Sequence, residues 1–209
     1  WASLYPLEKE AIDYFIHNAG SPNGVIEGGI AIFAAGNEYA AMPAFPSAYS
    51  KCLSVAAIAA DYTPSCYTDY GAEVDFSAPG GDTEYYGDTL VNNDGTDWEN
   101  PNGAILSTLV INGEAGYGYY EGTSMSCPHV SGVAALALAH SLNIGKKLTA
   151  IDLRNILLGS THDIDRYCVG QTTGVSSQGS VTTIDLAKFK GKMGVGYIDA
   201  FKALMNVQG

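Results

Sequence analysis

The segment EGTSMSCPHVSGVAALALAH, residues 121–140, determines where the rest of the chain must lie. From Ser124 to about His140 it predicts a helix, with Pro128 in the first turn, where a missing N–H group costs little. Small or apolar residues occupy nearly every side of this helix. Because such a helix needs cover on all sides, we expect it at the centre of the fold, packed closely against its neighbours.

Apolar patterns on both sides of this segment predict alternating helices and strands. Residues 29–35, GIAIFAA, form a continuous apolar run, which is typical of a strand covered on both faces within a parallel sheet. A helix is expected over residues 7–19, and residues 1–3 would be the tail of an earlier strand, completing a βαβ crossover. Further strands are expected at residues 52–59, 73–77 and 105–109, and further helices at 150–159 and 199–207.

These elements predict an α/β protein with three layers, α/β/α, around a mainly parallel central sheet. The 209 residues fit one domain. The chain carries 22 acidic against 10 basic residues, a net charge of −12, which disfavours a nucleic-acid partner. Its longest apolar run, residues 133–139, is too short to span a membrane, for which about 20 residues are needed.

The four cysteines show no C-x-x-C spacing, so their pattern does not favour a zinc site. Cys52 and Cys66 flank an expected hairpin. Two arrangements are compatible with that placement, a disulfide in an oxidising compartment or two buried free thiols. Cys127 belongs to the apolar helix and is expected to act as a small buried hydrophobe.

Ser124 is the candidate reactive group. It lies at the start of the central helix, where unpaired backbone N–H groups and the helix dipole stabilise an anion formed beside it. The alternative is that Ser124 only caps the helix, a common place for serine. The segment is not a G-x-S-x-G elbow, because Ser126 occupies the last glycine position, and this disfavours an esterase of the α/β-hydrolase type.

Several segments resemble the motifs of one enzyme family. GTSMSCPHVSG (122–132) resembles the nucleophile motif of the subtilisin-like serine proteases, the subtilases, with Ser126 where the family usually has alanine. FAAGNE (33–38) is similar to the family's oxyanion-hole motif, and VDFSAPGG (74–81), ILST (105–108) and GVGYIDAFKAL (194–204) resemble three further motifs. WAS (1–3) resembles the strand that lines the substrate cleft. The matches follow the family's order along nearly the whole chain.

The resemblance implies a serine endopeptidase, in which Ser124 attacks the peptide carbonyl and the side-chain amide of Asn37 helps to hold the oxyanion. In subtilisin itself, loss of such an amide lowers the rate by about 10²–10³. The residues implied to border the substrate are Trp1, Ala2, Ser3, Ala34, Ala35, Gly36, Gly122 and Thr123. The small residues 34–36 would leave room for a large apolar or aromatic side chain of the substrate.

The catalytic base is missing from these motifs. A serine nucleophile needs a histidine and an orienting aspartate, which subtilases carry in H-G-T and D-[ST]-G motifs, and neither occurs here. The four histidines do not replace them. We therefore expect residues 1–209 to be the C-terminal two-thirds of a catalytic domain. Its N-terminal third, with its strands, has been cut away and is retained non-covalently, lies on another chain, or precedes these residues in a longer polypeptide. By itself the chain is then inactive, and the rival hypothesis is a non-catalytic scaffold or binding domain.

The resemblance also sets expectations for ligands and location. Acyl transfer on serine requires no cofactor, and the substrates would be proteins or peptides outside the cell or at its surface. The loop between Gly81 and Gly103 carries six acidic residues, whose oxygen atoms suit Ca²⁺. A structural calcium site there is a hypothesis, and a solvated acidic loop is its alternative.

Overall fold

The computed structural model describes residues 1–20, 24, 26–83, 103–175 and 181–208, and at its centre lies a five-stranded sheet. The strand order is β2-β3-β4-β11-β8, and all neighbours are parallel except β11 and β8. The strands are β2 (Ile32–Ala34), β3 (Leu53–Ile58), β4 (Phe76–Pro79), β8 (Thr161–His162) and β11 (Tyr197–Ile198). The predicted mainly parallel sheet is confirmed.

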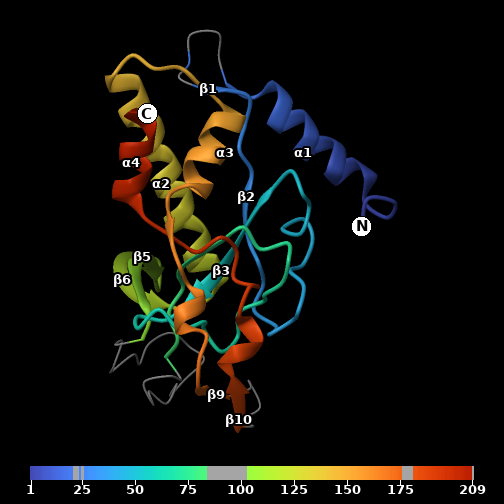
Figure 1. Cartoon of the computed structure of the whole chain (residues 1–209), viewed down its shortest axis with the longest axis vertical. Coiled ribbons are helices and arrows are strands. Elements are labelled where there is room, and N and C mark those ends of the chain that lie inside the picture. The colour runs from blue at the N-terminus through green and yellow to red at the C-terminus, as the bar shows by residue number, and fades with distance from the viewer. Residues whose placement is uncertain (21–23, 25, 84–102, 176–180, 209) are drawn as a thin grey trace.

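Three helices cover one face of the sheet, α2 (Thr123–Asn143), α3 (Ala150–Leu158) and α4 (Ala200–Gln208) (Figure 1). Alternate residues of β3 supply the core on this side, since Leu53 and Val55 pack in one apolar cluster with residues of all three helices. Phe76 of β4 joins them and is fully buried. The helix α2 is central in this layer, as the sequence predicts.

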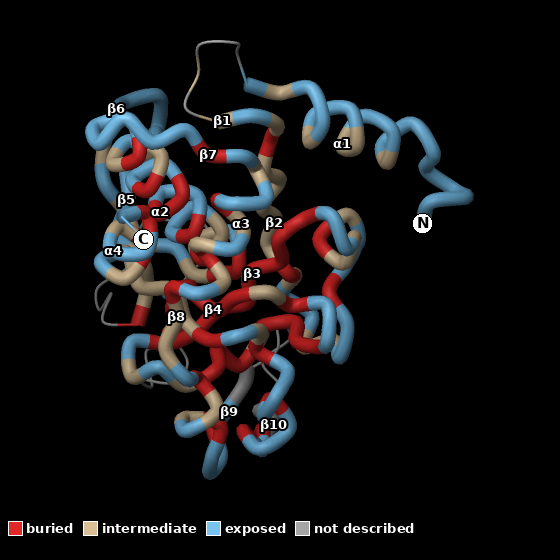
Figure 2. The backbone as a smooth tube through the Cα atoms, turned by 45° about the horizontal axis from the view of Figure 1, so that its top comes forward, coloured by how far each residue is buried: buried red, intermediate tan, exposed pale blue. Residues whose placement is uncertain are grey.

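The other face of β3 directs Ala56 and Ile58 into a second apolar cluster. Irregular segments and short elements cover it, among them η1 (Asp165–Tyr167), β10 (Val181–Asp185) and η2 (Leu186–Phe189). The strand β9 (Gln171–Val175) pairs with β10. Figure 2 shows the buried backbone concentrated between these two coverings. The helix α1 (Pro6–Asn18) lies beside β2, away from α3 and α4 in the view of Figure 1. This arrangement matches the predicted three-layer class.

Three two-stranded sheets lie outside the main one among the described residues, and one of them is the antiparallel pair of β9 and β10. The strand β1 (Ile26–Glu27) pairs with β7 (Leu148–Thr149), and β5 (Ile105–Ile111) pairs with β6 (Glu114–Tyr120) in a hairpin. The second strand of that hairpin is rich in glycine and tyrosine, and the sequence patterns did not predict it. None of the four cysteines belongs to a disulfide, so Cys52 and Cys66 are two buried thiols.

The first residues do not form the expected strand tail. Residues 1–4 make a turn, in which the amide groups of Leu4 and Tyr5 donate to the carbonyl of Trp1 at 2.9 and 2.8 Å. The indole of Trp1 stacks on Phe45, with ring centroids 5.2 Å apart. Aromatic stacking therefore holds these residues in a turn. They do not pair with β2, whose free side has no partner among the described strands.

The helix α2 is not covered on all sides, contrary to the prediction. Its sheet-facing side is buried, but Gly132, Ala135 and Ala139 are exposed within the described structure. On the same helix Leu136 and Leu142 are 51% and 62% exposed. The reason is that the sheet and α4 cover only part of its circumference. Of the helices in the described part of the chain, none has the length and apolar character required to cross a membrane.

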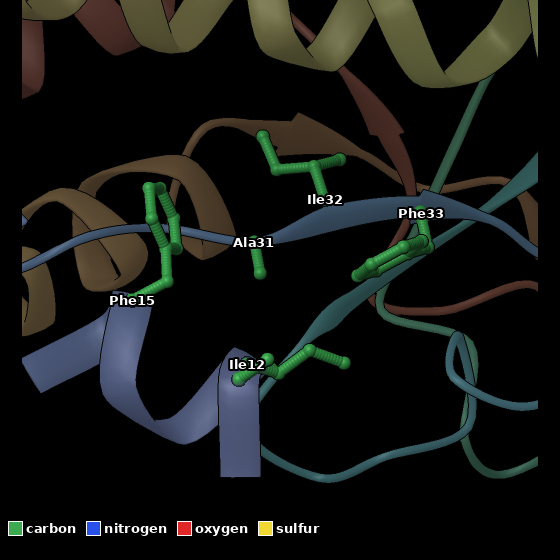
Figure 3. Close-up of a pocket in the computed structure, with 6 residues that line it drawn as sticks. Ile12, Phe15, Ala31, Ile32 and Phe33 are labelled. Atoms are coloured by element: carbon green, nitrogen blue, oxygen red, sulfur yellow. The ribbon is translucent and has the colours of Figure 1, made fainter. Parts of the chain in front are cut away.

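The edge strand β2 borders a groove that is lined almost wholly by apolar side chains. Ile12 and Phe15 of α1 form one side of it, and residues 31–33 form the other (Figure 3). None of the residues of α1 is buried, although Phe15 packs within 3 Å of the position that a Cβ on Gly29 would take.

A charged pair ties α3 to the sheet. Arg154 donates to Asp75 at 2.9 Å and to the carbonyl of Cys52 at 3.0 Å, and the second carboxylate oxygen of Asp75 accepts from the amide of Ser54 at 2.9 Å. Burial raises the pKa of Asp75, although the bonds from Ser54 and Arg154 act in the opposite direction. The carboxylate is thus held charged among apolar strands mainly by its donors.

Replacing Arg154 with alanine is expected to lower the free energy of unfolding by about 2 kcal/mol, since it leaves a half-buried carboxylate without its cation. This loss of stability is expected to be larger at neutral pH, where the Asp75 carboxylate is charged, than in mild acid. A raised pKa in the folded state means that protonation stabilises the fold, so acid relieves the unpaired charge. Urea unfolding at the two pH values measures both effects.

The matched control is Arg166→Ala on η1, whose guanidinium stacks on Tyr167 at the surface and should change stability by less than about 0.5 kcal/mol. Equal losses in the two variants, or a loss that does not depend on pH, would contradict the assigned role of Arg154.

Candidate active site

Ser124 is the second residue of α2, and its side chain is exposed. The N-cap is Gly122, which has φ 140° and whose amide donates to the carbonyl of Gly80 at 2.9 Å, just after β4. Ser124 is therefore not the cap of its helix, and the alternative that it serves only as a cap is wrong. A residue in the first helical turn has no intrahelical partner for its N–H, so that donor is free to face a ligand.

Asn37 is held against the same helix end. Its Oδ1 accepts two hydrogen bonds from Thr123, one from the backbone N–H and one from the hydroxyl, both at 2.8 Å. The amide of Gly36 in turn donates to the Thr123 hydroxyl at 3.2 Å. Since both donors occupy the amide oxygen, the Nδ2 end of Asn37 must point the other way, and the side chain is exposed there.

The two predicted oxyanion donors border one space beside Gly122. The point that a Cβ on Gly122 would take lies 3.5 Å from Nδ2 of Asn37 and 3.7 Å from the backbone nitrogen of Ser124. The Oδ1 atom of Asn37 lies 3.7 Å from the same point, and outside Gly122 and its chain neighbours no other described atom comes closer. A side chain at this position would fill the space, which is a physical reason for glycine there in addition to its positive φ. The structure therefore brings Asn37 and Ser124 together.

No described histidine contacts Ser124. The Nδ1 atom of His129 lies 2.8 Å from the carbonyl of Met125 on its own helix, and His140 is bonded to Gln208. Sequence reasoning missed a pair between His162 and Asp199, which are 2.6 Å apart. Their separation of 37 residues gave no signal of the contact. This pair joins β8 to the start of α4. In the described structure neither residue forms a hydrogen bond with Ser124, so the pair is not assigned as its catalytic base.

The other predicted substrate residues are placed as follows. Thr123 is buried and anchors Asn37, whereas Ala35 is fully buried in the core cluster beneath the sheet. Ala34 ends β2 and Gly36 follows it, before the loop that carries Asn37. The residues Trp1, Ala2 and Ser3 form the turn beside Phe45. Their role in binding substrate stays a prediction.

The predicted calcium loop falls mostly outside the described residues. Asp82, at its start, is buried and accepts from the amide of Cys66 at 2.7 Å, so this carboxylate serves the fold. Within the part of the chain that the structure describes, no three His, Cys, Asp or Glu side chains are grouped to hold a metal. The calcium hypothesis therefore depends on residues 84–102 and stays a prediction.

Residues 6–190 match the subtilase family. The chain belongs to that family. Its curated relatives include halolysin of Haloferax mediterranei, 35% identical over 156 residues, which are 74% of this chain and 24% of halolysin. The extracellular basic protease of Dichelobacter nodosus is 36% identical over 140 residues, 64% of this chain and 19% of that protein. This subtilase chain thus spans about a quarter or less of these two relatives' lengths.

Solved structures show the same subtilase fold. A lanthipeptide protease aligns with a TM-score of 0.62 and 22% identity, covering 97% of this chain and 55% of that one. A protease from Pseudoalteromonas arctica aligns with a TM-score of 0.60 and 24% identity, covering 85% of this chain and 42% of that one. At these identities the likeness establishes the fold alone.

Ser126 is a departure from the subtilase pattern that has a structural consequence. Its hydroxyl is fully buried and has no hydrogen-bond partner among the described residues. A Cβ on Gly80 would lie 2.5 Å from this hydroxyl and 2.5 Å from the Cβ of Ala57, so the site is tightly enclosed. A buried hydroxyl without a partner costs about 1–3 kcal/mol. We therefore expect Ser126 to destabilise the first turn of α2.

Replacing Ser126 with alanine is expected to raise the free energy of unfolding by about 1 kcal/mol, measured from the midpoint of urea unfolding. Ser131→Ala on the exposed side of α2 is the control, because it makes the same change in helix propensity and its hydroxyl is bonded to the carbonyl of Cys127. If both variants gain equally, propensity explains the effect and the buried hydroxyl does not.

Proposed function

We propose that this chain carries the nucleophile and oxyanion hole of a serine endopeptidase. One observation supports the proposal above all others. The amide oxygen of Asn37 accepts two bonds from Thr123, so that Nδ2 and the N–H of Ser124 border the same space. Donors aimed in advance at a developing negative charge supply a large part of catalysis in acyl transfer. A scaffold domain has no need for such a pair beside an exposed serine.

The chemistry follows from these groups. A base removes the proton from the hydroxyl of Ser124 as its Oγ attacks the peptide carbonyl carbon, and the carbonyl oxygen becomes an anion held by Asn37 and the N–H of Ser124. Collapse of this tetrahedral species breaks the C–N bond, and the departing amine takes the proton from the base. Water then hydrolyses the acyl-serine by the same route, releasing the acid and restoring Ser124.

The base and its orienting aspartate are proposed to come from an N-terminal segment of the same polypeptide. Two features of the described structure offer it a binding surface. The strand β2 pairs on one side only, and the apolar groove of Figure 3 runs along it. On α2, Gly132, Ala135 and Ala139 form an exposed strip of small residues that allows a helix to approach closely. A segment that adds strands beside β2 and a helix over α2 would bury both.

The proposed substrates are proteins or peptides with an apolar or aromatic side chain before the cleaved bond, since the wall at Ala34 and Gly36 is small. The setting is proposed to be outside the cell, consistent with relatives named as extracellular proteases. The reaction needs no cofactor, because the nucleophile, the oxyanion donors and the base are all protein groups.

Fluorophosphonate labelling of the full-length polypeptide is the decisive test. We expect an adduct on Ser124 and hydrolysis of a chromogenic peptide, and loss of both in Ser124→Ala. Asn37→Ala should keep KM and lower kcat by about 10²–10³, because only the transition state uses its amide. Residues 1–209 alone should label slowly, and adding the N-terminal segment in trans should accelerate labelling.

Intact-mass measurement identifies the adduct, and Asn206→Ala, which alters an exposed amide between α4 and Gly159, is the control for asparagine replacement. A full-length protein that is folded but neither labels nor hydrolyses peptides would support the scaffold hypothesis and refute the proposal.

Calcium is proposed only as a structural ion bound through the acidic loop. If the loop binds it, millimolar Ca²⁺ should raise the melting temperature of the full-length protein and EDTA should lower it, since a ligand that binds only the folded state stabilises that state. Mg²⁺ at the same concentration is the control for ionic strength. Identical melting curves in Ca²⁺ and EDTA would dismiss the site.

A further inference from the structure

Asp69 lies in the segment between β3 and β4 and is 2% exposed. Its Oδ1 accepts hydrogen bonds from the amides of Glu38 and Ala40, at 3.0 and 2.8 Å. These two amides flank Tyr39, which has φ 53°, a left-handed conformation that is unfavourable for a tyrosine. Two N–H groups around a left-handed residue form a concave site for an anion, and the carboxylate of Asp69 occupies it.

The second oxygen of Asp69 constrains the residue before Asn37. A Cβ on Gly36 would lie 2.1 Å from Oδ2, so the carboxylate packs directly on the backbone of Gly36. The amide of Asp69 donates to the carbonyl of Gly36 at 3.0 Å. One aspartate therefore contacts the loop on both sides of Asn37, at residue 36 and at residues 38 and 40.

Backbone pairing alone leaves this loop less constrained. Two further bonds join the same segments, from the amide of Tyr39 to the carbonyl of Tyr67 at 2.8 Å and from the amide of Tyr70 to the carbonyl of Ala40 at 2.9 Å. Neither bond satisfies the N–H groups of Glu38 and Ala40. Burial raises the pKa of Asp69, while the bonds from Ala40 and Glu38 lower it, so the buried carboxylate is retained at a cost in solvation.

We infer that Asp69 is a positioning residue for the oxyanion hole, which fixes the 36–40 loop so that the Asn37 amide faces the space beside Gly122. This rests on the proposed proteolytic function. The loop carries Asn37 from the end of β2 to Thr123. Asp69 determines the conformation of this loop through its contacts with the backbone of residues 36, 38 and 40. Without the carboxylate, the amides of Glu38 and Ala40 lose their common hydrogen-bond acceptor, and Tyr39 leaves its left-handed conformation.

A double-mutant cycle in the full-length protein tests the inference. Asp69→Ala is expected to lower kcat by about 10²-fold with KM nearly unchanged, because a misplaced group of this kind costs about that much. In the Asn37→Ala background the same substitution should lower kcat by less than about twofold, since a residue that acts through Asn37 has nothing left to position. Asp69→Asn keeps an acceptor at Oδ1 and should stay within about threefold of the parent.

The structural control is Asp152→Ala, which removes another aspartate that accepts backbone and side-chain bonds, in the capping box of α3. It should lower the melting temperature and leave kcat unchanged. If Asp69→Ala does not fold, Asp69→Ser replaces it in the cycle, since the shorter side chain cannot bridge both amides. Equal losses in the wild-type and Asn37→Ala backgrounds would overturn the inference alone. A folded but inactive wild type would overturn the proposed function and this inference together.

Discussion

Two hydrogen bonds to a single amide oxygen connect the parts of this structure that matter for function. They run from Thr123 to Asn37, residues 86 positions apart, and join the loop after β2 to the start of α2. Gly122 is tied at the same place to Gly80 after β4. The carboxyl ends of two parallel strands and the N-terminus of the central helix therefore meet at one point. Backbone N–H groups and the positive end of the helix dipole gather there, where an anion is stabilised.

Buried charges in this protein lie where backbone donors meet them. Asp75 is held by the amide of Ser54 and by Arg154, and Asp69 by the amides of Glu38 and Ala40. Both aspartates belong to the connection between β3 and β4, so one segment stabilises α3 on one side and the Asn37 loop on the other. Ser126 is the opposite case, a buried hydroxyl without a described partner, two residues after Ser124.

The sequence alone determined the alternation of helices and strands and the central place of α2, and it singled out Ser124 and Asn37, whose catalytic roles stay predictions. These depend on local patterns: continuous apolar runs predict buried strands, and short motifs preserve backbone geometry that only a few residue types allow. The prediction that α2 is covered on all sides was wrong. The sequence shows which of its side chains are apolar, but it does not show which of them contact a neighbouring element. The strand β6 was missed because glycine and tyrosine alternate in it without the usual apolar signal.

Only the tertiary structure decided how the amide of Asn37 is oriented, that Gly122 caps α2 in place of Ser124, and that Asp69 contacts the loop that carries Asn37. Each of these depends on contacts between segments distant in the chain, such as the 29 residues that separate Ala40 from Asp69. An aspartate in a loop has the same appearance in a sequence whether it is solvated or buried. Its burial and its hydrogen-bond donors are fixed by packing, and packing is a property of the folded chain as a whole.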